Sequence, residues 1–187
     1  RQAHVIMASR FAKQKDQPTL IQAMRILNEQ HVQTRLSLAG VGKARLIQHS
    51  QKMSAQWGLS SQVDFLGHVS NMPELLAKHQ IFVLSTHYEG MPLALIEAMA
   101  SGCACIGTDV VGVREVIQHG VTGLLVPENN APALAEAIAM LIRDSEKAEN
   151  LGKAARVSVM QNFTLKVMSE NYTRLLLALY QQNKVSF

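Results

Sequence analysis

Two glutamates, Glu89 and Glu97, are spaced so that both could bind one ligand. Glu89 lies in a polar loop beside Gly90, and Glu97 falls about one and a half turns into a helix expected to begin at Pro92. The start of a helix carries free backbone N–H groups and a partial positive charge, which favour a phosphate. Carboxylates accept hydrogen bonds from sugar hydroxyls. The pattern therefore predicts a site for a phosphate with a polyhydroxylated group on each side, as in a nucleotide sugar.

The helix around Glu97 is otherwise apolar. Its neighbours in the sequence are Leu95, Ile96, Ala98 and Met99. We therefore expect the Glu97 carboxylate to be buried and to need a hydrogen-bond partner, which a pair of ligand hydroxyls would supply. The alternative is an ordinary exposed glutamate on the surface of the helix.

Three cations follow the first expected strand, within residues 9–15. Arg10 offers a planar, two-pronged donor for a phosphate and Lys15 offers a point charge, so both are candidates to hold an anion. Lys13 is expected to be solvated. The alternative for the whole segment is a solvated basic turn.

A glycine turn, Gly40-Val41-Gly42-Lys43, invites two familiar interpretations and fits neither. A dinucleotide-binding fingerprint needs a third glycine where Arg45 stands. A phosphate-binding loop of the Walker A type needs a glycine where Ser37 stands and a serine or threonine in place of Ala44. What is left is a tight turn that either brings backbone close to a ligand or reverses the chain.

Two further loops carry polar residues whose role stays open. Glu115 lies in the first turn of a short helix expected over 111–118, where a carboxylate favours the helix dipole whether or not a ligand binds. His87 precedes Glu89 in its loop and His68 follows the third expected strand, and either could contact a ligand or be an ordinary loop residue. The seven histidines do not gather at metal-ligand spacing, so no metal is expected.

Short apolar runs alternate with longer segments of helical periodicity along the chain. The expected strands cover residues 5–8, 36–39, 63–66, 81–84, 103–107 and 123–127. This order predicts a doubly wound α/β fold of the Rossmann-like class, with a mostly parallel six-stranded sheet. In this class ligands bind beyond the carboxyl ends of the strands. The site is therefore expected in the loops at residues 9–15, 40–43, 67–72, 85–91 and 107–113.

The intervening helices have recognisable starts and stops. Asp16 with Pro18 opens the first, Gly58 is a plausible stop for the second, and Asn71 caps a short third. Residues 131–180 are expected to form a helical C-terminus of three helices, with breaks near Asp144 and residues 162–164.

The composition fits a folded domain, which we expect to cover residues 1–187. Of these residues 48% are apolar and 17% are charged, with a net charge of +4. These values exclude a disordered chain, and a charge so small and so spread out gives no argument for binding nucleic acid. No apolar run reaches the roughly 18–20 residues that span a bilayer.

The only two cysteines, Cys103 and Cys105, are too close along one strand for a comfortable disulfide. We expect reduced thiols in a core strand, which suits a cytoplasmic protein. The sequence begins at Arg1, without an initiator methionine or a signal peptide. We therefore expect a domain excised from a longer protein.

Several motifs together resemble the donor-binding half of group 1, or family 4, retaining glycosyltransferases of the GT-B fold. The segment 89–102 resembles the family's E-x7-E motif with its EAMA-x-G tail, and Arg10 with Lys15 resembles its first-strand R…K pair. Residues 65–67 resemble its F-x-G strand end. Segments 112–117 and 123–126 resemble its GG-x-x-E-v and tG-l-v segments, although Val111 stands in place of the first glycine of that pair. The resemblance spans residues 5–180.

The resemblance implies a role for each matching residue. Arg10 and Lys15 would hold the diphosphate of a nucleoside diphosphate sugar, Glu97 would bind the ribose hydroxyls and Glu89 the transferred sugar. The catalytic set would be Glu89, Arg10 and Lys15, with no cofactor and no metal. The resemblance also implies that the leaving group departs from the face that the acceptor attacks, so Glu89 would position the sugar.

Backbone and small groups complete the donor site that the resemblance implies. The N–H groups near Gly90, Met91 and Leu93 would cradle phosphate and sugar, whereas Pro92 has no N–H to contribute. The base would lie against Gly67, His68 and Val69.

The resemblance further implies that an N-terminal acceptor-binding domain is absent here, so that the chain alone does not transfer sugar. Residues 164–184 would form a helix that crosses back to that domain. Its apolar face would then be partly uncovered, at Val167, Met168, Tyr172, Leu175, Leu176 and Leu179. We expect a homodimer through residues 165–180. The full enzyme would work in the cytoplasm, with peripheral association at the inner face of the membrane, on a glycan or lipid-linked acceptor.

Two other functions stay open at this point. A nucleotide-sugar epimerase of the same build would bind the same class of ligand. A non-catalytic interaction module would keep only the fold, although the set of Arg10, Lys15, Glu89 and Glu97 argues against it.

Overall fold

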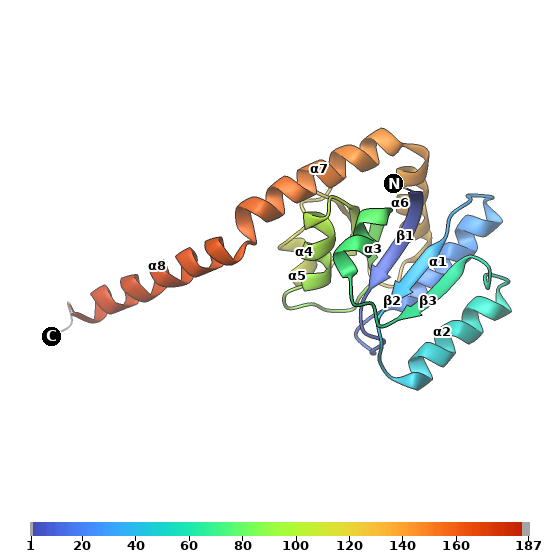
Figure 1. The fold of residues 1–187 in the computed structure, drawn as a ribbon, viewed down its shortest axis with the longest axis horizontal. Helices are drawn as coiled ribbons and strands as arrows, with labels where there is room; N and C mark the ends of the chain where they lie inside the picture. Colours follow the sequence, from blue (N-terminus) through green and yellow to red (C-terminus); the bar gives the residue numbers. More distant parts are fainter. Residues whose placement is uncertain (1, 185–187) are drawn as a thin grey trace.

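The computed structural model describes residues 2–184, which form a parallel sheet covered by helices on both faces (Figure 1). The strands are β1 (Gln2–Ala8), β2 (Leu36–Ala39), β3 (Val63–Gly67), β4 (His79–Leu84), β5 (Ala104–Thr108) and β6 (Leu124–Val126). They lie in the order β3-β2-β1-β4-β5-β6, and each neighbouring pair runs parallel. This is the strand order of the Rossmann fold, so the predicted fold class is confirmed.

The helices pack in two layers against this sheet (Figure 1). One layer holds α1 (Gln17–Glu29), α2 (Ala44–Gln56) and α6 (Ala131–Arg143). The other holds α3 (Met72–Lys78), α4 (Leu93–Ala100) and α7 (Ser145–Asn162). Because both faces are covered, β4 and β5 are almost completely buried, as the short apolar runs of the sequence indicate.

One helix is shorter than its sequence pattern predicts. The helix expected over 111–118 is a single turn, α5 (Val111–Arg114). The chain leaves helical geometry after it because Val116 and Ile117 turn inward and are buried against the sheet. Glu115 is exposed and forms the C-cap of α5, so the expectation that it lies in the first turn and favours the helix dipole is wrong.

Most helix starts are capped by the chain itself. The side chains of Asp16, Asn71, Asn130 and Asp144 accept hydrogen bonds from backbone N–H groups in the first turns of α1, α3, α6 and α7. Helices α2, α4 and α5 have no side-chain cap, and at α4 the N-cap residue is Pro92. At the start of α4, Leu93 N donates to the backbone oxygen of Met91 at 3.0 Å.

The C-terminal helix α8 (Leu165–Lys184) extends away from the body of the molecule (Figure 1). Its apolar side chains are exposed, with fractions of 50% at Met168, 62% at Tyr172 and 63% at Leu176. The predicted uncovered face is thus confirmed. None of the helices within residues 2–184 has the length and apolar character needed to cross a membrane.

The two thiols lie in the core. Cys105 is in β5, Cys103 directly precedes that strand, and both are buried and free of disulfides, as predicted. Burial raises the pKa of the Cys105 thiol well above its usual range, and the neighbouring Cys103 adds to the effect. These thiols are therefore structural rather than reactive.

Candidate functional site

A cavity of about 320 Å³ opens where the carboxyl ends of β1 and β4 meet the start of α4. Its volume lies in the range of small-molecule sites. It brings together five of the residues that the sequence nominates for a site: Arg10, Lys15, Glu89, Met91 and Leu93. The remaining lining residues are Ala8, Ser9, Gln14, Leu84, Pro92 and Ala94.

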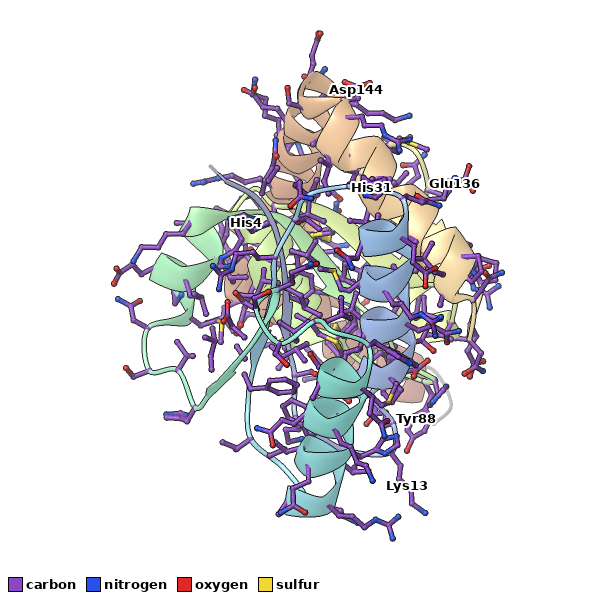
Figure 2. All side chains as sticks on the ribbon, turned by 90° about the vertical axis from the view of Figure 1, so that its right-hand side faces the viewer. His4, Lys13, His31, Tyr88, Glu136 and Asp144 are labelled. Atoms are coloured by element: carbon purple, nitrogen blue, oxygen red, sulfur yellow. The ribbon has the colours of Figure 1, made fainter. Side chains whose placement is uncertain are left out.

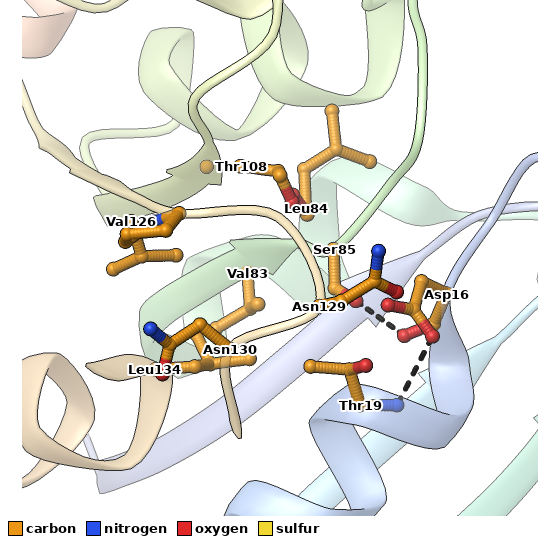
Figure 3. Close-up of a pocket in the computed structure, with 12 residues that line it drawn as sticks. Asp16, Thr19, Val83, Leu84, Ser85, Thr108, Val126, Asn129, Asn130 and Leu134 are labelled. Carbon is orange, nitrogen blue, oxygen red and sulfur yellow. Dashed lines mark hydrogen bonds between the residues drawn. The ribbon is translucent and has the colours of Figure 1, made fainter. Parts of the chain in front are cut away.

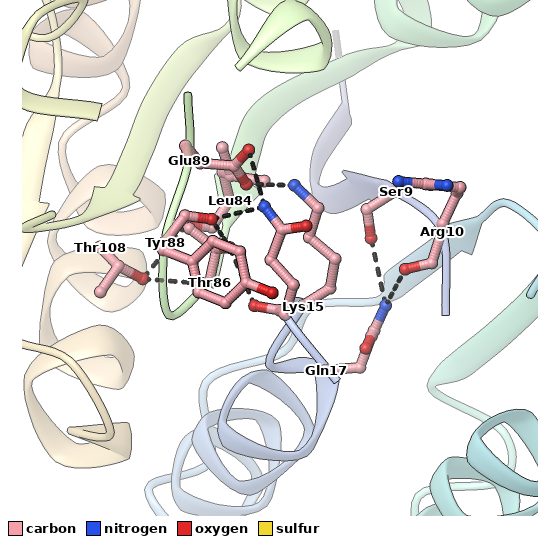
Figure 4. Close-up of polar contacts among 10 residues, drawn as sticks. Ser9, Arg10, Lys15, Gln17, Leu84, Thr86, Tyr88, Glu89 and Thr108 are labelled. Atoms are coloured by element: carbon pink, nitrogen blue, oxygen red, sulfur yellow. Dashed lines mark hydrogen bonds and ion pairs between the residues drawn. The ribbon is translucent and has the colours of Figure 1, made fainter. Parts of the chain in front are cut away.

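The centre of this cavity is an ion pair between Lys15 and Glu89 (Figure 4). The Lys15 ammonium contacts one carboxylate oxygen of Glu89, and their side chains are only 14% and 6% exposed. The sequence assigns these two residues to different parts of a ligand. In the structure, the two charges are paired with each other.

Gln14 is a third member of this cluster, which the sequence analysis did not single out. Its side-chain Nε2 donates to the backbone oxygen of Tyr88 at 2.5 Å and to the second carboxylate oxygen of Glu89 at 3.3 Å. The available signal was its position directly before Lys15, in a loop at the carboxyl end of a central strand.

Backbone bonds hold the loops after β1 and β4 together (Figure 4). The backbone oxygen of Gln14 accepts from His87 N at 2.9 Å and from Thr86 Oγ1 at 3.0 Å. Lys15 and Thr86 form an isolated antiparallel bridge. Thr108, at the end of β5, then accepts from Thr86 N at 3.0 Å. Neighbouring strands thus place residues about 74 positions apart in contact.

Arg10 occupies the outer side of the cavity and is exposed. Gln17 fixes its backbone, because Gln17 Nε2 donates to the backbone oxygen of Arg10 at 3.0 Å and to Ser9 Oγ at 3.1 Å (Figure 4). Within residues 2–184 the guanidinium group of Arg10 has neither an ion pair nor a hydrogen bond. Arg10 is therefore a positioned cation that is free to bind an anion.

The glycine turn supports the Arg10 loop. A side chain at Gly40 would place its Cβ 2.0 Å from the backbone oxygen of Ser9, and one at Gly42 would place it 2.3 Å from that of Phe11. The glycines therefore allow the turn to pack against the loop after β1. The close approach that these glycines allow is to the chain's own backbone, which favours the interpretation as a structural turn over approach to a ligand.

Gly112 has a similar role on the other side of the cavity. A Cβ at this position would lie 2.4 Å from the backbone oxygen of Glu89 and 2.6 Å from that of Gly90. Val111, which replaces the first glycine of the family pair, is 67% exposed and meets no such restriction. Only the second glycine is needed for α5 to reach the Glu89 loop.

Glu97 does not line the cavity, and the expectation that it is buried is wrong. Its side chain is exposed on α4. The apolar neighbours that suggested burial, such as Ala98 and Met99, point toward the core instead. Leu93 and Ala94 line the cavity, and Glu97 lies one turn further along the same helix face.

The residues assigned to a base also lie outside this cavity. Gly67 ends β3 and His68 and Val69 follow it, and β2 separates β3 from β1. The backbone oxygen of Gly67 accepts from Gly40 N at 2.7 Å, which joins this loop to the glycine turn. The three residues therefore lie along the same edge of the sheet, but not in the same hollow.

His87 contacts an acidic residue of another loop. Its Nδ1 lies 2.6 Å from Glu128 Oε1, in the segment after β6. This contact ties two loops together, which favours the interpretation of His87 as a loop residue. His68 is exposed on the loop after β3, and within the described part of the chain its side chain makes no hydrogen bond or ion pair of this kind.

A second, much smaller hollow lies between the start of α1 and the ends of β4, β5 and β6 (Figure 3). Asp16, Thr19, Ser85 and Thr108 are among its lining residues, and its volume is about 10 Å³. This suits one water molecule and excludes a nucleotide. Around residues 2–184 there is no group of three or more His, Cys, Asp or Glu side chains that could hold a metal ion.

The outer surface beside the site carries both charged and apolar side chains, among them Lys13, Met91 and Leu93. Figure 2 shows Lys13 and Tyr88 projecting at the end of the molecule where the loops after β1 and β4 lie. Lys13 is exposed, as predicted for a solvated residue.

The family model described as glycosyl transferases group 1 matches residues 1–158. N-acetyl-alpha-D-glucosaminyl L-malate synthase of Bacillus anthracis is 35% identical over 171 residues, which cover 90% of this chain and 43% of that protein. The chain thus spans less than half the length of this relative.

Two solved structures have the same fold. HepE of Anabaena, in complex with UDP and glucose, matches 95% of this chain and 48% of its own, with a TM-score of 0.88 at 23% identity. The C-terminal domain of the group 1 family protein LpcC from Francisella tularensis matches 87% of this chain and 86% of its own, with a TM-score of 0.79 at 24% identity.

Proposed function

This chain belongs to the glycosyl transferases group 1 family, and we propose that it is the nucleotide-sugar-binding part of a retaining glycosyltransferase. The observation that carries the proposal is the cavity at the carboxyl ends of β1 and β4. It combines two cations, Arg10 and Lys15, with the Glu89 carboxylate and the uncapped start of α4. This set matches a pyrophosphate attached to a sugar.

The cations act on the leaving group. As the bond between the anomeric carbon and the diphosphate oxygen breaks, negative charge grows on the nucleoside diphosphate. Arg10 and Lys15 stabilise that charge, and the N–H groups at the start of α4, near Gly90, Met91 and Leu93, add to this effect. This arrangement needs neither a metal ion nor a cofactor.

The two carboxylates bind hydroxyl groups. Glu89, at the inner end of the cavity, holds and orients the transferred sugar, and the leaving group and the acceptor share one face of that sugar. Glu97, exposed one turn along α4, binds the ribose hydroxyls. The base lies further along the sheet edge, against Gly67, His68 and Val69.

A further domain binds the acceptor, a glycan or a lipid-linked sugar. The proposal is supported by the family and by the fact that this chain spans less than half of its relative. The apolar face of α8 packs against that domain, and in the isolated chain residues 165–180 pair with a second copy. The chain alone binds the donor without transferring its sugar.

The enzyme works in the cytoplasm, associated peripherally with the inner face of the membrane. Two observations support this location. Both cysteine thiols are buried and free of disulfides, and the net charge of +4 suits loose attraction to an anionic surface.

A thermal-shift screen with UDP, GDP and ADP tests the donor-binding proposal. We expect at least one nucleoside diphosphate to raise the melting temperature, and Glu97→Gln to weaken the effect because it replaces a charged acceptor of the ribose hydroxyls with a neutral amide. Glu136→Gln, on the exposed side of α6, serves as the control. A chain that ignores all three nucleotides would be an interaction module, contrary to the proposal. Release of nucleoside diphosphate from a nucleotide sugar without an acceptor would indicate an epimerase.

A further inference from the structure

The donor's pyrophosphate has an internal competitor. If the proposed function is correct, on which this inference rests, Lys15 binds the pyrophosphate and Glu89 binds the sugar. In the structure these two side chains are paired with each other. The Glu89 carboxylate therefore occupies the cation that the pyrophosphate needs, and binding requires an exchange of one anion for another.

The exchange leaves Glu89 in need of a partner. Its side chain is 6% exposed, so water has little access to the carboxylate. A buried charge without a hydrogen bond is costly. The one other side chain that contacts this carboxylate in the described structure is Gln14, whose Nε2 lies 3.3 Å from the oxygen that Lys15 does not hold.

Gln14 is itself held on both sides. Its Nε2 also donates to the backbone oxygen of Tyr88 at 2.5 Å, and its own backbone oxygen accepts from His87 and Thr86. The amide group is thus fixed to the loop that carries Glu89, independently of Lys15. It can keep the carboxylate in place when Lys15 turns to another anion.

We propose that Gln14 is a positioning residue of this site, which retains the Glu89 carboxylate while Lys15 exchanges it for the pyrophosphate of the donor. The ion pair then has two functions. It neutralises both groups in the free protein, and it makes the release of Glu89 toward the sugar depend on the arrival of the pyrophosphate.

Calorimetry with inorganic pyrophosphate tests the competition without knowledge of the base or the sugar. Glu89→Gln removes the competing charge, so we expect pyrophosphate to bind about five- to tenfold more tightly than to the unchanged chain. Lys15→Met removes the shared cation, and binding falls about tenfold or more. Glu74→Gln breaks a lysine–glutamate pair on the surface of α3 and leaves the affinity unchanged.

A double-mutant cycle tests the role of Gln14. Gln14→Met keeps the length of the side chain but removes its hydrogen-bond donors. When pyrophosphate replaces Glu89 on Lys15, the Glu89 carboxylate is then left without a partner, so we expect pyrophosphate to bind about threefold more weakly. In the Glu89→Gln background the same change has no effect, because no charge is stranded. A merely structural role in the loop would weaken binding in both backgrounds. Gln62→Met, which removes an amide paired with Asn28, is the control.

The outcomes separate this inference from the proposed function. If Lys15→Met weakens binding but Glu89→Gln does not strengthen it, the competition is wrong and the donor site stands. Equal effects of Gln14→Met in both backgrounds overturn the role of Gln14. If the unchanged chain binds neither pyrophosphate nor any nucleoside diphosphate, both proposals fail. Circular dichroism of each variant confirms that it is folded.

Discussion

Two regions of the molecule expose side chains of opposite character. The loops after β1 and β4, called the loop edge below, carry charged groups, and the helix α8 carries apolar ones. At the loop edge, contacts with neighbouring residues fix the charged groups in place. Arg10 and the start of α4 adjoin the cavity there. On α8, apolar side chains are not covered by neighbouring residues of the described structure. Leu165, for example, is 80% exposed. Topology alone can assemble a charged site from one chain, whereas an apolar face needs a second surface to cover it.

The largest expected effect is on the loop edge, from Gly112→Val. The new side chain would collide with the backbone oxygens of Glu89 and Gly90, so α5 has to move. We expect a loss of about 3 kcal/mol in the free energy of unfolding and a loss of nucleoside diphosphate binding. Denaturant unfolding and calorimetry measure the two effects. Gly90→Ala meets no atom within 4 Å and is the matched control; equal stability of both variants would contradict the packing argument.

Arg10→Met separates binding from stability. The guanidinium is exposed and unpartnered in the described structure, so its removal should leave the melting temperature unchanged. Nucleoside diphosphate affinity should fall by about 2 kcal/mol, the size of a charge-assisted hydrogen bond. Arg35→Met, which removes a cation paired with Asp64, is the control for charge. An unchanged affinity would remove Arg10 from the site.

Asp16→Ala tests whether nucleotide binding at the loop edge depends on the N-terminal cap of α1. Asp16 Oδ1 caps α1 through Thr19 N at 3.1 Å, so we expect a loss of about 1 kcal/mol in stability. The Asp16 backbone bonds to Ser85 remain in this variant and connect the start of α1 to the loop after β4, so fraying of that start is passed to the loop and nucleotide affinity falls slightly. Asn130→Ala removes the matching cap of α6 and should cost the same stability with no change in affinity. Identical affinities for the two variants would argue against this coupling.

The smallest effect on the fold is expected from α8. Leu175→Glu with Leu179→Glu places charges on the exposed face, where no packing is lost. Stability and nucleotide affinity should stay unchanged, and self-association should disappear. Light scattering at high concentration measures the association, with Gln181→Glu as the control. A monodisperse monomer before any substitution would show that residues 165–180 do not pair with a second copy.

Local patterns in the sequence were sufficient for much of the fold. The strand β2 has the predicted bounds, and Asp16 and Asn71 cap the predicted helices. These features depend on nearest neighbours in the chain, on apolar runs and on short side chains that reach backbone N–H groups a few residues away. The helix α5 was overextended because burial of Val116 and Ile117 depends on the sheet beneath it.

The candidate site was predicted in its residue types but not in its contacts. The motif identified Glu89 and Lys15, yet their ion pair joins two loops that only the order of β1 and β4 in the sheet brings together. The same is true of Gln14, whose role depends on the loop opposite. Glu97 has apolar neighbours in the sequence, and only the orientation of α4 shows that its side chain faces outward.

The sequence by itself determined the order of strands and helices, the starts of most helices and the family of the chain, because each is encoded in local pattern. The tertiary structure alone decided which charges meet and which glycines must stay small. The physical reason is that these depend on atoms far apart in the chain, whose distances are set only when the sheet and its helices pack.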